Sequence, residues 1–292
     1  MSNRSAVVAG RFYPSRTAEC RRELGACLPE ADELPEIAGR VIGGVGPHAG
    51  WMCSGAVMGL TAAVLGRRRD VRAVVMFGAV HVRGVDAAAM FASGAWETPL
   101  GAVGVDEDLA RAIAAAGIGV NAAAHQFEHS IEVQVPFVQH YLPGARIVPI
   151  MVPVNDESHE VGAAAARACR DAGGEVVFLG SSDLTHYGPA YDFTPKGVGA
   201  AGLGWAKEHN DRRMIDAMLR MDAAGIVPEA EAHWNACGAG AIAATIAACR
   251  EMGASDATLL RHTTSYEVLR ERMGEPAEDA VGYAGVVFAR PD

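Results

Sequence analysis

The sequence contains no run of about 18 uninterrupted apolar residues, the length that a helix needs to cross a membrane. Residues 1–11 carry arginines, but they include no long apolar segment and no signal-cleavage pattern. These two absences predict a cytoplasmic protein without a membrane partner.

Clustered basic residues are also scarce. The one basic run, residues 67–69, ends a predicted helix, where arginines complement the helix dipole. The net charge of -10 and the pI of about 5.5 argue against the basic surface that a nucleic-acid partner requires. We therefore expect no nucleic-acid partner.

The six cysteines include no Cys-x-x-Cys pair, and the chain has no local zinc-finger motif. In a reducing compartment most of them would be small buried apolar residues. Cys237 is the exception, because it lies just before a predicted helix, where the helix dipole favours a thiolate.

The chain also lacks repeats, low-complexity tracts and a convincing linker. Half of its 292 residues are hydrophobic, and short apolar strands alternate with helices. This alternation predicts one α/β domain over residues 1–292, with a central mixed or mainly parallel sheet flanked by helices. We expect strands at 41–45, 71–77, 87–92, 146–152, 175–179, 258–265 and 282–289, helices at 17–28, 55–65, 107–116, 130–140, 157–172, 200–221 and 239–250, a turn at 96–101 and a loop at 222–232.

Polar side chains follow three of the predicted strands at the point where each strand ends. His48 follows Gly46-Pro47 and precedes a helix that Ser54 is expected to cap, and His81 follows the second strand. Asp183 and His186 follow a third strand and, in a helical turn, would share a face. Open α/β sheets place their chemistry at this edge.

His48, His81 and Cys237 together form a candidate metal site. Two imidazoles and a thiolate suit iron(II), copper or zinc, and three protein ligands leave positions open for water, dioxygen or substrate. His129, Asp183 and His186 would then orient the ligands or transfer protons. Glu128 and Glu132 could equally be ordinary cap and helix-face carboxylates. His233 could flank the site or simply lie on a loop. The other histidines are expected to be surface or core residues: His125, His140, His159, His209 and His262.

Five motifs, in this order, resemble those of the Memo family, which is named for a mediator of ErbB2-driven cell motility and is similar to the LigB-type class III extradiol dioxygenases. They are Ala-Gly-Arg-Phe-Tyr-Pro at 9–14, Gly-Pro-His-Ala-Gly at 46–50, Glu-His-Ser-Ile-Glu at 128–132, Ser-Ser-Asp-Leu-Thr-His-Tyr-Gly at 181–188 and Cys-Gly at 237–238.

The resemblance implies a LigB-type α/β fold and the same site, with His129, Asp183 and His186 near His48, His81 and Cys237. In the ring-cleaving relatives two histidines and a carboxylate hold iron(II). Cys237 stands where that carboxylate would be expected, and a thiolate is softer and can be oxidised. The segment Gly78-Ala79-Val80-His81 is a second departure, because relatives tend to carry a polar residue before the histidine, where this chain has Ala79.

These observations favour a metal-dependent oxidoreductase, with iron(II) as the expected ion and copper or zinc as alternatives. It would act as a dioxygenase on a small, phenolic substrate. The main alternative is a copper- or iron-binding protein or redox-linked scaffold without ring cleavage. Partner binding through the cleft and zinc-dependent hydrolysis were also considered, and the apolar content is compatible with a homodimer.

Overall fold

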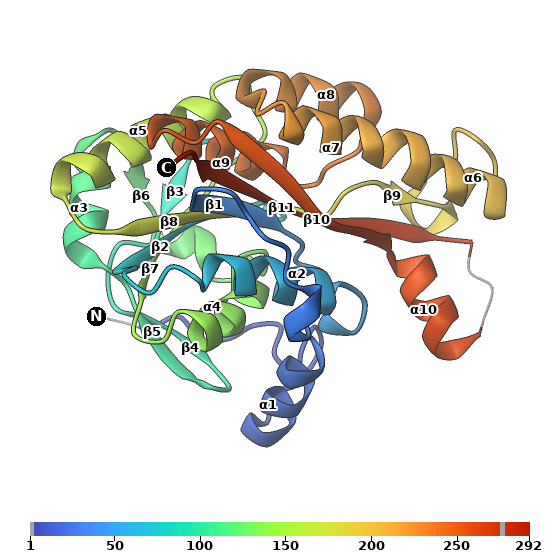
Figure 1. The fold of residues 1–292 in the computed structure, drawn as a ribbon, viewed down its shortest axis with the longest axis horizontal. Helices are drawn as coiled ribbons and strands as arrows, with labels where there is room; N and C mark the ends of the chain where they lie inside the picture. The colour runs from blue at the N-terminus through green and yellow to red at the C-terminus, as the bar shows by residue number, and fades with distance from the viewer. Residues whose placement is uncertain (1–2, 275–277) are drawn as a thin grey trace.

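One mixed sheet runs through the protein and separates two groups of helices (Figure 1). The computed structural model describes residues 3–274 and 278–292. In spatial order the strands are β10 (Asp256–Thr264), β11 (Ala280–Arg290), β1 (Arg40–Gly46), β8 (Val176–Ser181), β2 (Ala73–Gly78), β7 (Arg146–Met151), β3 (Ala89–Met90) and β6 (Gly119–Val120), and β9 (His186–Tyr187) pairs with β11.

The centre of the sheet is parallel and its flanks are largely antiparallel. Strands β1, β8, β2 and β7 run in one direction, whereas β11 is antiparallel to β1 and β10, and β3 is antiparallel to β7. The four central strands are buried almost throughout, as the apolar runs predicted. The predicted α/β class with a mixed sheet is confirmed.

Helices cover both faces of the sheet (Figure 1). One face carries α3 (Glu107–Ala115), α5 (Ser158–Ala172), α7 (Arg212–Leu219), α8 (Ile226–His233) and α9 (Ala239–Glu251), and the other carries α1 (Thr17–Ala26), α2 (Trp51–Leu65) and α4 (Val135–Tyr141). Helices α5 and α9 pack closely because Gly162 leaves no side chain between the backbones. Two further helices, α6 (Ala200–Trp205) and α10 (Ser265–Met273), project beyond the sheet (Figure 1).

Three predicted elements were wrong. Helix α2 begins at Trp51, and Ser54 lies inside it, where its hydroxyl donates to the Ala49 carbonyl instead of capping the helix. Residues 96–101 belong to a hairpin of β4 (Ala95–Thr98) and β5 (Gly101–Gly104). Most of residues 222–232 belong to α8. Pro228 is compatible with this helix because it lies in the first turn, where a missing N–H costs little.

Two predicted helices are interrupted. Residues 200–221 form α6, a π-helical segment (Ala206–Asp211) and α7. Residues 130–140 contain a short 3₁₀ turn (Glu132–Gln134) before α4, and Pro136 lies in the first turn of α4. Among residues 3–274 and 278–292, no helix combines the length and the apolarity required to span a membrane.

Candidate metal centre

The predicted metal ligands meet at the carboxyl edge of the parallel strands. His48 follows β1, His81 follows β2, and Cys237 precedes the amino end of α9. Their ligand atoms all lie within 4.8 Å of one another. The structure thus brings together side chains that are up to 189 positions apart, and their role as metal ligands stays a prediction.

His48 is almost completely buried, and its orientation is fixed by a serine hydroxyl. The Ser181 hydroxyl donates to the Ser130 carbonyl at 2.7 Å, so its oxygen accepts from Nδ1 of His48 at 2.9 Å. Nδ1 therefore carries a proton, and Nε2 faces the Cys237 sulfur at 3.3 Å. This arrangement turns the metal-binding nitrogen toward the other two ligands.

His81 is fixed by a carboxylate, which the sequence analysis did not assign to the site. Oε1 of Glu128 accepts from Nδ1 of His81 at 3.0 Å and from the backbone N–H groups of His129 and Ser130, while Oε2 accepts from the backbone of His81. Burial would raise the pKa of Glu128, but these hydrogen bonds hold it well below its usual range. Burial likewise opposes the positive charge on His81, but hydrogen bonds with Cys237 and Glu128 raise its pKa to about 10.

Cys237 behaves as a thiolate. Burial alone would raise its pKa, but His48 and the hydrogen bonds from His48 and His81 lower it to about 6. The backbone N–H of Asp183 also donates to its sulfur at 3.3 Å. Burial lowers the pKa of His48, yet Asp183 and Cys237 more than offset this effect and raise it.

Asp183 and His129 also contact residues of the centre, and the roles assigned to them stay predictions. Oδ1 of Asp183 accepts from the backbone of His48 at 2.8 Å, and Oδ2 lies 3.9 Å from Nε2 of the same residue. The His129 ring stacks on His81 with 4.7 Å between centroids. Burial and the charges of His48 and His81 lower the pKa of His129 to about 4, so it is neutral at neutral pH.

His186 contacts different residues from the other members of the predicted site. It belongs to β9, so the chain after Asp183 is extended, and the expectation that the two share a helical face was wrong. Nδ1 of His186 forms a hydrogen bond with the Leu184 carbonyl at 3.0 Å, and the ring makes an edge-to-face contact with Tyr191. Among the described residues, His186 forms no hydrogen bond with the three predicted ligands, but it lines a shallow depression together with Cys237.

The spacing of one pair of ligand atoms is compatible with a bound metal ion. Bonds of about 2.3 Å to sulfur and about 2.0 Å to nitrogen place these atoms roughly 3.5 Å apart in a tetrahedral site. The distance between Sγ of Cys237 and Nε2 of His48 is 3.3 Å. A metal ion would displace the protons that the thiolate and imidazoles otherwise share, as ligands of this kind require.

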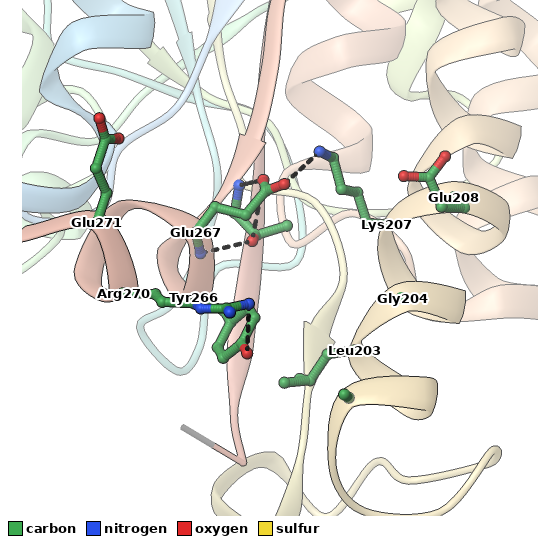
Figure 2. A pocket seen from close by; sticks show the side chains of 10 residues that line it. Leu203, Gly204, Lys207, Glu208, Tyr266, Glu267, Arg270 and Glu271 are labelled. Atoms are coloured by element: carbon green, nitrogen blue, oxygen red, sulfur yellow. Dashed lines mark hydrogen bonds and ion pairs between the residues drawn. The ribbon is translucent and has the colours of Figure 1, made fainter. Parts of the chain in front are cut away.

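A second cavity lies away from the centre. This cleft of about 580 Å³ opens between the end of α6 and α10, and half of its lining residues are charged (Figure 2). Lys207 pairs there with Glu267, and the Arg270 guanidinium lies 5.9 Å from the centroid of Tyr266. The cleft holds no cluster of metal-ligating side chains, so its size alone does not make it the functional site.

Fold and site together define an α/β protein with a two-histidine, one-cysteine centre at the carboxyl edge of its sheet. The model of the Memo-like protein family matches residues 4–287. The chain therefore belongs to the Memo family, as the five motifs predicted.

Relatives of similar length support this assignment. MEMO1 family proteins from Pyrobaculum aerophilum, Methanococcoides burtonii and Thermococcus kodakarensis are each 36% identical to this chain. The alignments cover 99%, 97% and 98% of this chain and 100%, 99% and 99% of the relatives. One solved structure, an uncharacterized protein from Escherichia coli K12, aligns over 83% of this chain and 99% of its own with a TM-score of 0.49 and 12% identity, and no functional inference rests on it.

Proposed function

We propose that this protein is a metal-dependent oxidoreductase of the non-heme iron(II) dioxygenase type that acts on a small phenolic substrate in the cytoplasm. The observation that carries the proposal is the convergence of two imidazole nitrogens and one thiolate. Each group is aimed by other protein atoms: Ser181 for His48, Glu128 for His81 and the Asp183 amide for Cys237. Such fixed aim is typical of metal ligands.

The residues around the centre supply proton transfer. An iron(II) ion held by His48, His81 and Cys237 would provide open positions for substrate and dioxygen, and would allow electrons to pass from the substrate, which is oxidised, to dioxygen, which is reduced. His129 retains 21% exposure of its side chain and lies beside two of the ligands. A metal ion would displace the protons of His48 and His81, whose charges help to lower the pKa of His129, and His129 could then accept a proton from a substrate hydroxyl. Asp183 keeps the His48 backbone in place during this step.

A second candidate is a copper- or iron-binding protein or redox-linked scaffold. The observation that favours it is the thiolate, because sulfur favours copper(I) more than a carboxylate does. Ring cleavage would also expose an oxidisable ligand to dioxygen. In either case a small molecule or ion is the partner that we propose, and a homodimer stays a prediction.

Metal analysis and oxygen uptake separate these functions. The protein is purified without oxygen, its metal content is measured, and oxygen uptake is followed with a panel of catechols. Stoichiometric iron together with uptake supports the enzyme, whereas tightly bound copper(I) without turnover supports the binding protein.

Ligand variants test the site itself. We expect His48→Ala, His81→Ala and Cys237→Ala each to lose stoichiometric metal and all oxygen uptake. His140→Ala, which removes an exposed histidine outside the centre, should match the parent. The metal site would be refuted if the three ligand variants bound metal as tightly as the parent.

A further inference from the structure

A shallow depression of about 300 Å³ opens beside the metal-ligand sulfur. Three ionisable side chains line it, His186, Glu231 and Cys237, and its other lining residues are apolar or aromatic. The complete lining is Val154, Leu184, His186, Ala230, Glu231, Trp234, Ala236 and Cys237. No lysine or arginine contributes to it among the residues that the structure describes.

Trp234 has an unfavourable backbone conformation and an unfavourable exposure for its residue type. It follows the last turn of α8 with φ of 53°, and its N–H donates to the Ala230 carbonyl at 2.7 Å. Glycine or asparagine normally takes this left-handed position, because a Cβ is strained there. The indole is also 66% exposed. Backbone conformation and exposure therefore both disfavour a tryptophan at this position.

The indole is nevertheless held in place. It stacks on Phe193 with 5.8 Å between centroids and 16° between planes. The next residue, Asn235, is fully buried, and its amide donates to the Asn210 carbonyl at 3.0 Å and to Glu229 at 3.1 Å. Phe193 and the buried Asn235 thus hold Trp234 in the lining of the depression, three residues before Cys237.

We infer that Trp234 selects a planar aromatic ligand by stacking, and that Glu231 excludes rings that carry an anionic substituent. This inference rests on the proposed function and specifies its substrate: a neutral or amine-bearing aromatic diol whose oxygens point toward Cys237 and the centre. Stacking on an exposed indole favours any flat ring. The lone carboxylate of the depression, without a compensating cation, disfavours a catechol carboxylate.

Substitution of Trp234 separates a ligand role from a structural one. We expect Trp234→Gly to weaken catechol binding about tenfold, the size of a lost aromatic stack. Its melting temperature should change little, because the left-handed strain that glycine relieves offsets the lost stack on Phe193. Trp234→Phe should bind within about threefold of the parent. A structural role would instead lower the melting temperature of Trp234→Gly and its metal content.

Binding is measured by calorimetry without oxygen on zinc-loaded protein, so that turnover does not interfere. Tyr266→Ala is the matched control, because Tyr266 lines the other cleft (Figure 2), and it should bind catechol as the parent does. Equal catechol affinity of Trp234→Gly and the parent, or an equal loss in Tyr266→Ala, overturns the inference. So does a parent that loads metal but binds no catechol at millimolar concentration, whereas a parent that loads no metal refutes the proposed function instead.

The role of Glu231 is tested with two probes. An amine-bearing catechol, 3,4-dihydroxyphenethylamine, should bind the parent several-fold more tightly than 3,4-dihydroxybenzoate. Glu231→Gln should reduce this preference, and so should added salt, because both weaken the charge interaction. A parent that prefers the benzoate, or a preference that is unchanged in Glu231→Gln, contradicts the assignment of Glu231.

Discussion

Two buried polar clusters lie close together in this protein, and they differ in what their atoms face. In the first, Arg4 and Glu132 form an ion pair at 2.8 Å with side chains only 3% and 1% exposed. The second is the candidate metal centre. Every strong donor and acceptor of the first cluster meets a protein group, whereas the second leaves two imidazole nitrogens and a sulfur turned toward a common point.

The partners of the first cluster show why it is structural. Glu132 accepts from the backbone of Val7 and Val8 and from the Tyr13 hydroxyl, each at 2.9 Å. Arg4 donates to the carbonyls of His125 and Glu128. This cluster therefore fastens the amino-terminal segment to the loop that supplies Glu128 and His129. A cluster whose polar groups all have protein partners has a structural role, whereas ligand atoms that converge on one point are the arrangement that a metal site requires.

The largest expected effect comes from breaking the saturated cluster. Glu132→Ala should lower the free energy of unfolding by about 3–5 kcal/mol, because it leaves Arg4 buried without its counter-charge. Urea unfolding measures this loss. Asp108→Ala is the control, because it removes an ion pair with Arg111 in which the Asp108 side chain is 81% and the Arg111 side chain 74% exposed. It should change the free energy of unfolding by less than about 0.5 kcal/mol. Equal effects of the two variants would contradict this view of the first cluster.

Acid should weaken the protein next most strongly, through His125. Burial lowers the pKa of this histidine to about 4, and its Nδ1 has no hydrogen-bond partner among the described residues. An unfolded histidine has a pKa of about 6.5, so between these values the unfolded chain binds a proton that the folded protein refuses. Stability from this group is complete above about pH 6.5 and falls by about 3 kcal/mol as the pH drops to about 4.

Unfolding in urea at several pH values tests the role of His125. The His125→Gln variant keeps a donor for the Ala89 carbonyl but cannot titrate. Its stability should therefore decline less steeply between pH 6.5 and pH 4 than that of the parent. Parallel curves for the two proteins would assign the acid loss to other groups.

The smallest effect sharpens the comparison within the centre itself. Glu128→Gln should weaken metal binding ten- to a hundredfold, because a carboxylate that aims a histidine ligand also raises its basicity. Ser181→Ala removes the neutral partner of His48 and should cost less. Competition with a coloured chelator measures both affinities, and a larger loss in Ser181→Ala would reverse the assignment.

Much of the centre was predictable because local signals mark it. Buried apolar strands that end in His48, His81 and Asp183 place these residues at one sheet edge whatever the remaining chain does. The position of Cys237 before α9 was also predicted from the sequence. The family motifs then supplied the grouping that separate positions could not.

The rest depended on contacts between distant segments. His186 is directed by the pairing of β9 with β11, which no local spacing reveals. The opposite roles of Glu128 and Glu132, four residues apart, follow from which partners the fold brings: His81 for one and Arg4 for the other. Helix α8 was missed because Pro228 and its polar neighbours resemble a loop until packing is known.

The serine and glutamate that orient the imidazoles belong to the polypeptide, so a metal ion at the proposed centre would enter an arrangement that the fold itself provides. We therefore expect the proposed site to release a metal ion and to bind another without refolding. In that case the metal that the protein contains would depend on which ions are supplied as well as on the geometry of the site.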